Sequence, residues 1–140
     1  MHSNVILAPL FAQILLTFIV WVTMYKTRVE EMKKKKIHPQ SLVDKQEAAD
    51  LLKDSAWPAN NFNNLFEIPV LFYLLTIVIY ITQTADDIFL VLLSAFVLTR
   101  YIHSYIQISY NKIMHRFKVY FVSSTIVWVG WVILGYRLFA

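Results

Sequence analysis

Four long stretches that carry almost no charge constrain this chain more than any other feature of its sequence. Three uncharged runs cover residues 3–25, 68–85 and 119–136, and a further apolar run, residues 88–110, is interrupted by one arginine and one histidine. Crossing the hydrocarbon layer takes about 20 apolar residues as a helix, and a helix satisfies its backbone polar groups within one segment. We therefore predict an all-α integral membrane four-helix bundle. It forms a single domain with spans at about residues 4–26, 62–83, 87–110 and 117–137.

The composition argues against a soluble protein and against a nucleic-acid partner. Hydrophobic residues make up 58% of the chain and charged residues only 16%, whereas soluble domains are about a quarter charged. A soluble fold of this composition would expose large apolar patches. The basic residues flank the apolar spans instead of forming a solvated stripe, which excludes the usual nucleic-acid footprint. The chain has no cysteine, so thiolate ligands are absent and no metal site is expected.

The connections between the spans predict how the chain lies in the membrane. The first connection, residues 26–54, holds eight Lys or Arg residues, the second, residues 83–87, holds none, and the third holds Lys112, Arg116 and Lys118. By the positive-inside rule, the first and third connections are cytoplasmic and both termini lie on the opposite side. The first span lacks a basic start and a small-residue cleavage site, so we expect a permanent helix. From the spare architecture we expect a bacterial inner membrane.

Polar residues inside the spans need a reason, because an ionisable group there costs about 2.5–3.5 kcal/mol on insertion scales. Asn64 and Glu67 are three residues apart and share one helix face, although capping of the second span is an alternative role for them. Arg100, His103 and Gln107 form one stripe of the third span. A structural ion pair between Arg100 and Glu67 is the alternative explanation for that stripe.

A third cluster, Arg116 and Tyr120, opens the fourth span, where anchoring of a helix end is the alternative. All three clusters fall near the same side of the membrane, and Arg28 at the end of the first span can join them. Arginine pairs with carboxylates through a bidentate fork, and Glu67 can hold an ammonium group. The residues therefore suit a small zwitterionic or polyanionic ligand, such as a short peptide with two carboxylates and one amine.

Several short motifs, in this order, resemble a known family. They are Asn64-x-x-Glu67 followed by Pro69, then Arg100-x-x-His103, then Arg116 and Tyr120. The motifs and the four-span layout resemble the MAPEG family, the membrane-associated proteins in eicosanoid and glutathione metabolism. Within that family the spacing is similar to that of the microsomal glutathione transferase and prostaglandin E synthase-like members.

The resemblance implies a homotrimer that binds glutathione between neighbouring subunits near the cytoplasmic face. Carried over by position, Arg116 is the catalytic residue, poised near the sulfur to stabilise a thiolate, which is the nucleophilic form. Arg28 and Arg100 would bind carboxylates, and Glu67 the amine. The residues expected to bind glutathione are Arg28, Asn64, Glu67, Arg100, His103, Gln107 and Tyr120.

Two departures from the synthase-like pattern bear on the activity. Gln107 replaces a tyrosine, so we expect one hydroxyl contact to the ligand to be missing or altered. Phe117 replaces a serine, which argues against prostaglandin isomerisation. We expect a glutathione-dependent transferase or peroxidase acting on small lipophilic electrophiles that arrive through the bilayer. The alternatives are a non-catalytic lipid-binding or scaffold protein and an accessory subunit of a larger complex. A transporter is disfavoured because the sequence gives no sign of broken helices.

Overall fold

The computed structural model describes residues 3–140, and every regular element within them is a helix. The prediction of an all-α bundle is confirmed. Four helical segments are long and apolar enough to cross a membrane: Asn4–Lys35, Ala56–Ile81, Asp87–Ile108 and Ile113–Phe139. The elements are η1 (Ser3–Leu7), α1 (Ala8–Lys35), η2 (Pro39–Leu42), α2 (Lys45–Leu51), α3 (Ala56–Asn64), α4 (Ile68–Ile81), α5 (Asp87–Ile108) and α6 (Ile113–Phe139).

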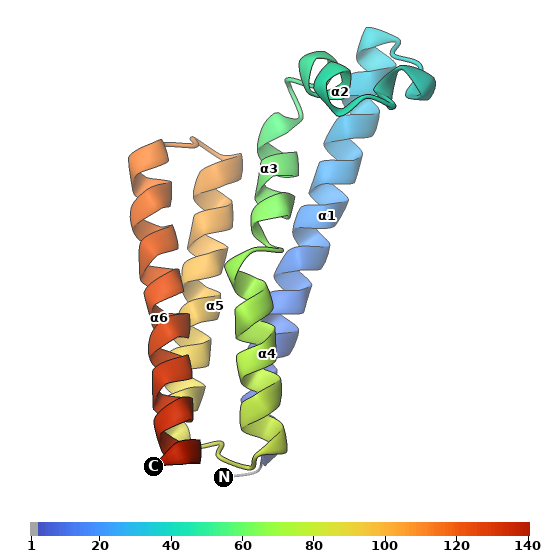
Figure 1. Ribbon diagram of the computed structural model, residues 1–140. Helices are drawn as coiled ribbons and strands as arrows, with labels where there is room; N and C mark the ends of the chain where they lie inside the picture. The colour runs from blue at the N-terminus through green and yellow to red at the C-terminus, as the bar shows by residue number, and fades with distance from the viewer. Residues whose placement is uncertain (1–2) are drawn as a thin grey trace.

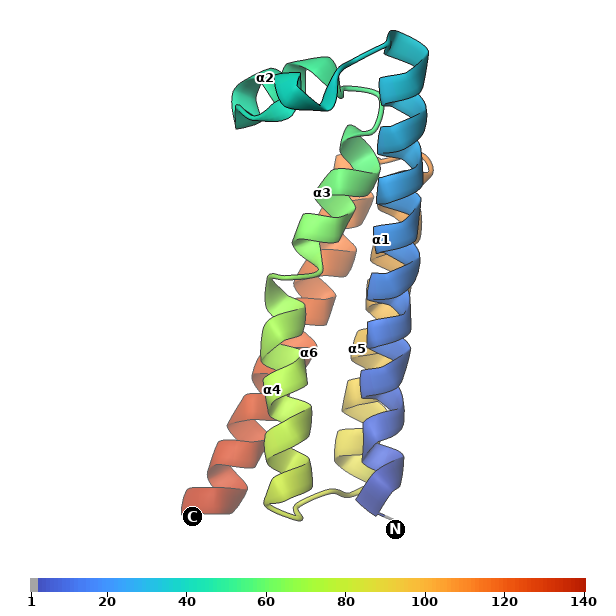
Figure 2. The ribbon, with the colours of Figure 1, turned by 90° about the vertical axis from the view of Figure 1, so that its right-hand side faces the viewer.

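The long helices run side by side, with both chain ends at one end of the bundle (Figure 1). We call this the terminal end. The opposite end, here called the basic end, holds the last turns of α1, the segment η2–α2 and the α5–α6 connection. Turned by 90°, the structure shows α1 continuing beyond the other long helices and α2 lying across its axis (Figure 2). The bundle therefore has a membrane-length body and a separate projection at its basic end.

Aromatic side chains make up much of the centre of the bundle. Phe72 of α4 stacks on Phe96 of α5 with ring centroids 4.5 Å apart, and Phe89 and Leu93 belong to the same buried cluster. Large apolar side chains also cover the outside, where Phe121 is 63% exposed. Helices that are apolar on all faces suit a lipid environment, because a soluble protein would keep one face polar.

The second span is broken near its middle. α3 ends at Asn64 and α4 begins at Ile68, and the ribbon changes direction between them (Figure 1). Pro69 lies in the first turn of α4, where its missing N–H costs nothing, whereas in an unbroken helix it would remove a hydrogen bond. The expectation of unbroken helices was therefore wrong, and it no longer argues against a transporter.

The projection at the basic end is tied to α1 by one buried carboxylate. Glu31 is 5% exposed. It accepts hydrogen bonds from the backbone N–H groups of Asp54 at 3.0 Å and Ser55 at 2.9 Å, and pairs with Lys35. The start of the second span is thereby fixed against the last turns of the first. Asp44 caps α2 by accepting from the N–H groups of its first turn.

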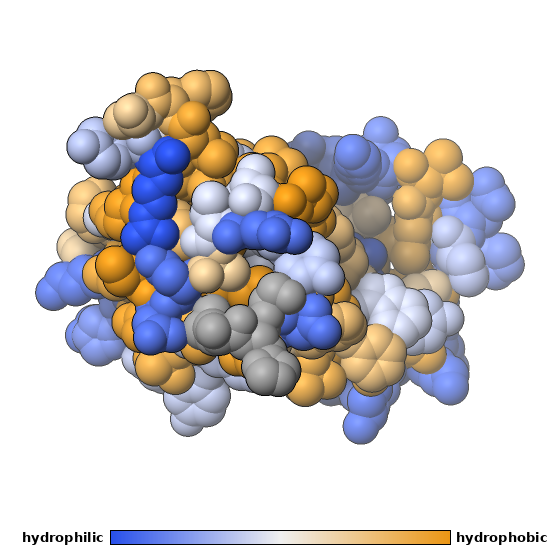
Figure 3. Space-filling model, turned by 90° about the horizontal axis from the view of Figure 1, so that it is seen from below, coloured by the Kyte–Doolittle hydropathy of each residue, from blue (hydrophilic) through white to orange (hydrophobic). Residues whose placement is uncertain are grey.

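An ion pair joins α5 and α6 at the terminal end, where hydrophilic residues are scattered among hydrophobic ones (Figure 3). Arg137 lies 2.7 Å from the carboxylate of Asp86, and its guanidinium stands 4.8 Å from the centre of the Phe89 ring. Asp86 also accepts from the Phe89 N–H at 2.9 Å. Partial burial alone would raise the pKa of Asp86, but these hydrogen bonds and the charge of Arg137 together lower it.

Candidate functional site

A polar hollow of about 240 Å³ lies in the half of the bundle nearer the basic end. We call it the polar hollow. Its walls come from the α3–α4 break, α5 and the first turns of α6. The residues that line it are Asn64, Glu67, His103, Ile113, Arg116, Phe117 and Tyr120. Five residues proposed from the sequence therefore face one common space.

Tyr120 connects the two sides of the polar hollow. Its hydroxyl donates to the Glu67 carboxylate at 3.1 Å, and its ring centre lies 5.9 Å from that of His103. Glu67 occupies the N-cap position of α4, yet its side chain makes no capping hydrogen bond. The capping role considered for this carboxylate is therefore wrong, and its oxygens face the hollow and Tyr120.

Arg100 lies at the back of the site and is fully buried. Its Nη2 donates to the backbone carbonyl of Asn64 at 3.3 Å, at the end of α3, where helix carbonyls concentrate negative charge. Its guanidinium carbon also stands 5.7 Å from the ring centre of Tyr120. The Nε and Nη1 atoms have no hydrogen-bond partner, and residues 3–140 contain no ion pair between Arg100 and Glu67. The proposed structural ion pair is therefore absent, and this cation keeps unused donors.

Two amide contacts join α3 to α5 behind the hollow. Gln107 is 1% exposed and accepts from the Asn64 side-chain amide at 3.0 Å. Ser104 donates to the Asn61 side-chain oxygen at 3.0 Å. Gln107 therefore orients a hollow-lining residue instead of lining the hollow itself. Asn61 and Ser104 were not predicted from the sequence. Asn61 lies three residues before Asn64, and Ser104 three residues before Gln107, so each shares a helix face with a predicted residue.

Arg116 presents a cation that no carboxylate neutralises. Its Nη1 donates to the side-chain oxygen of Asn111 at 2.7 Å. No Asp or Glu among residues 3–140 forms an ion pair with it. A guanidinium that shares a hollow with one carboxylate and lacks a carboxylate of its own can bind an anion there.

Arg28 lies apart from the polar hollow within one subunit. It lines a second hollow, of about 620 Å³, beside η2, α2 and α3. Polar neighbours in that hollow include Lys45, Ser55, Asn60 and Asn63. The structure therefore does not bring Arg28 together with Arg116 in a single copy of the chain.

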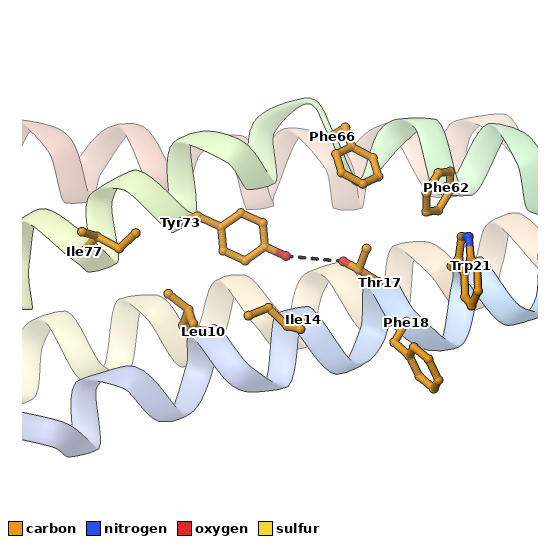
Figure 4. A pocket seen from close by; sticks show the side chains of 9 residues that line it. All are labelled: Leu10, Ile14, Thr17, Phe18, Trp21, Phe62, Phe66, Tyr73 and Ile77. Carbon is orange, nitrogen blue, oxygen red and sulfur yellow. Dashed lines mark hydrogen bonds between the residues drawn. The ribbon is translucent and has the colours of Figure 1, made fainter.

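An apolar groove of about 570 Å³ runs between α1 and the α3–α4 segment. Figure 4 shows Thr17 and Tyr73 pointing toward each other across it, with their hydroxyl oxygens 3.4 Å apart. The remaining lining is apolar: Leu10, Ile14, Phe18, Trp21, Phe62, Phe66 and Ile77. Phe66 lines this groove while the adjacent Glu67 lines the polar hollow, so the α3–α4 break separates the two spaces.

The fold and the site define a class of protein: an integral membrane helical bundle with a polar hollow between its helices. Residues 6–136 match the model of the MAPEG family. The chain belongs to the MAPEG family, which includes glutathione transferases, glutathione peroxidases and non-catalytic members. No curated protein matches the chain. No solved structure matches it.

Proposed function

We propose that this protein is a membrane-embedded, glutathione-dependent transferase or peroxidase that acts on lipophilic electrophiles. The observation that carries the proposal is the unneutralised Arg116 guanidinium in the same hollow as Glu67 and Tyr120. Members of the MAPEG family commonly use glutathione. The hollow presents a cation, Arg116, and a carboxylate, Glu67, to pair with the oppositely charged groups of that tripeptide.

The residues of the hollow fit the groups of glutathione. Glu67 is the one carboxylate that lines the hollow, so it is the partner for the ammonium group. Arg100 does not line the hollow itself but lies behind its Tyr120 wall. Its unpartnered Nε and Nη1 call for an acceptor, because a buried donor without one costs about 1–3 kcal/mol. A carboxylate of the tripeptide would meet part of that need by accepting a charge-assisted hydrogen bond from one of these two donors.

The size of the hollow supports a site that is completed by a second subunit. Its volume of about 240 Å³ is smaller than the roughly 300–1,000 Å³ of ordinary ligand pockets. We propose the homotrimer that is implied by the family resemblance, with Arg28 of the partner subunit closing the site. The positive-inside rule places the basic end in the cytoplasm, from which glutathione would enter, while the electrophile would arrive from the bilayer.

Arg116 is the proposed catalytic residue. When bound, glutathione supplies a sulfur nucleophile, which is reactive as the thiolate. The positive charge of Arg116 favours the charged form of the thiol beside it, and the released proton passes to water. Tyr120 and Glu67 hold the tripeptide and Arg100 fixes its carboxylate, so that the sulfur faces Arg116. The low dielectric of the bundle strengthens each of these interactions.

Replacing Arg116 tests the proposal. In detergent-purified protein, Arg116→Ala should lower kcat by about 10²–10³-fold, the usual loss for one electrostatic stabiliser, while KM for glutathione changes far less. Conjugation of an aryl halide and reduction of a lipid hydroperoxide are the two assays. Lys118→Ala is the matched control, because Lys118 is an exposed cation on the same helix outside the hollow. Turnover that survives the Arg116 change would remove this residue from the chemistry.

The apolar groove favours one alternative function, lipid binding without catalysis. Its nearly uninterrupted apolar lining and single hydroxyl pair suit an acyl chain, and non-catalytic MAPEG members exist. Calorimetry separates the two functions. A protein that retains lipid through purification but gives no heat with glutathione would be a lipid-binding or scaffold protein.

A further inference from the structure

Asn111 adopts an unusual backbone conformation in the α5–α6 connection. Its φ of 46° lies in the left-handed region, which Asn and Gly tolerate better than other residues. Its N–H donates to the Ile106 carbonyl at 2.8 Å, the type of bond that satisfies carbonyls at a helix C-terminus. This backbone role closes α5 and does not require an amide side chain, because glycine serves equally well at such positions.

The Asn111 side chain has a separate contact, with the Arg116 guanidinium. Its Oδ1 accepts a hydrogen bond from Arg116 Nη1 at 2.7 Å, a short distance typical of charge-assisted bonds. Arg116 lies in the first turn of α6, where a long basic side chain can otherwise turn toward the headgroups. The contact therefore selects a direction for the guanidinium, toward the hollow that Arg116 lines.

The chemistry of the acceptor matters as much as its position. An amide oxygen is neutral, so it orients the guanidinium and leaves its positive charge uncompensated. A carboxylate in the same place would orient the guanidinium equally well. Its negative charge would offset the positive charge of Arg116 that an anionic ligand needs. Residues 3–140 provide no such carboxylate for Arg116.

We propose that Asn111 is a positioning residue for Arg116: its amide oxygen aims the guanidinium at the polar hollow, and its neutrality reserves that positive charge for the sulfur of the ligand. The inference rests on the proposed glutathione chemistry and adds to it a residue outside the hollow's lining. It assigns two independent roles to one residue, a backbone role toward α5 and a side-chain role toward α6.

Two substitutions separate these roles. Asn111→Gly keeps the left-handed backbone and deletes the amide, so kcat should fall by about tenfold or more, as expected for a misplaced catalytic group, with KM for glutathione little changed. Asn111→Asp keeps the acceptor and adds a negative charge. The thiol of glutathione bound to this variant should ionise at a higher pH than in the wild type. The ultraviolet absorbance of the thiolate measures this ionisation. Thermal melting confirms that each variant is folded, and the isosteric aspartate carries the test if the glycine variant is unstable.

Tyr110→Phe is the control within the same connection. It removes the hydroxyl that lies 3.1 Å from His115 Nδ1 and should leave kcat and thiolate ionisation unchanged. Wild-type kcat in folded Asn111→Gly would confine Asn111 to its backbone role and overturn the inference. An unchanged ionisation in Asn111→Asp would refute the claim about neutrality. If the unmodified protein binds no glutathione, the proposed function itself fails, which is a different result from either.

Discussion

A buried arginine with unpartnered donors lowers the stability of the fold unless a ligand accepts hydrogen bonds from it. Arg100 is fully buried, and its one hydrogen bond goes to a backbone carbonyl. Replacing a buried charge by an apolar side chain of similar volume is often neutral or stabilising by about 1–4 kcal/mol. The retention of Arg100 at this position is therefore better explained by binding than by folding.

Arg100→Met should separate these two contributions. We expect the detergent-solubilised variant to melt at the same temperature as the wild type or higher, because an incompletely paired charge is removed. Its Kd for glutathione should rise by about tenfold or more, as a charge-assisted hydrogen bond is lost. Melting and calorimetry on the same preparation measure both. A strongly lowered melting temperature would instead make Arg100 a structural residue.

Much of the candidate site could be predicted at the level of residues, because spacing along a helix determines which side chains share a face. Asn64 and Glu67, near the middle of the second span, and Arg116 and Tyr120, at the start of the fourth, do face one hollow. The partners could not be predicted. Glu67 accepts from Tyr120 and forms no ion pair with Arg100, and spacing along one helix does not determine which side chains pair between helices.

Among the elements, α4 and α6 pack closely at a glycine. A Cβ atom on Gly130 would stand 2.6 Å from Leu75 Cδ2, whereas one on Gly135 would meet nothing within 4 Å. Leu75 is 1% exposed, so it has little room to move aside. The two glycines lie on the same helix and differ in this contact.

Gly130→Ala should therefore destabilise the protein relative to Gly135→Ala. Both substitutions gain the same helix propensity, about 1 kcal/mol, so the difference between them isolates the steric cost, about 1–3 kcal/mol for overpacking a core. Thermal unfolding in one detergent gives the comparison. Equal melting temperatures would mean that Leu75 finds another rotamer without cost.

Elements were easier to predict from this sequence than their interruptions. Apolar length alone indicates a helix in lipid, since no other single segment satisfies its own backbone. The α3–α4 break could not be predicted, because Leu65, Phe66 and Ile68 keep the segment apolar. Pro69 does not mark the break either, since proline is equally compatible with the start of a helix.

For the whole molecule, the Asp86–Arg137 pair links the beginning of α5 to the end of α6. Because the pKa of Asp86 is lowered in the folded protein, the carboxylate form is favoured by folding. The resulting stability is fully present above the unfolded pKa, about 3.9, and is lost as the pH falls through the lower folded value.

A pH series on two neighbouring variants tests this linkage. Asp86→Asn should lower the melting temperature near neutral pH and should weaken its decline below about pH 4. Asp87→Asn is the control, because Asp87 is exposed and forms no ion pair in the described chain. Identical acid profiles for the wild type and Asp86→Asn would show that other carboxylates govern the acid response.

The α3–α4 break, residues 65–67, has a consequence for how the two spaces can move. Two consecutive residues line different spaces: Phe66 lines the apolar groove, and Glu67 lines the polar hollow. A shift of the backbone that displaces the α-carbons of both residues would therefore reshape the apolar groove and the polar hollow together.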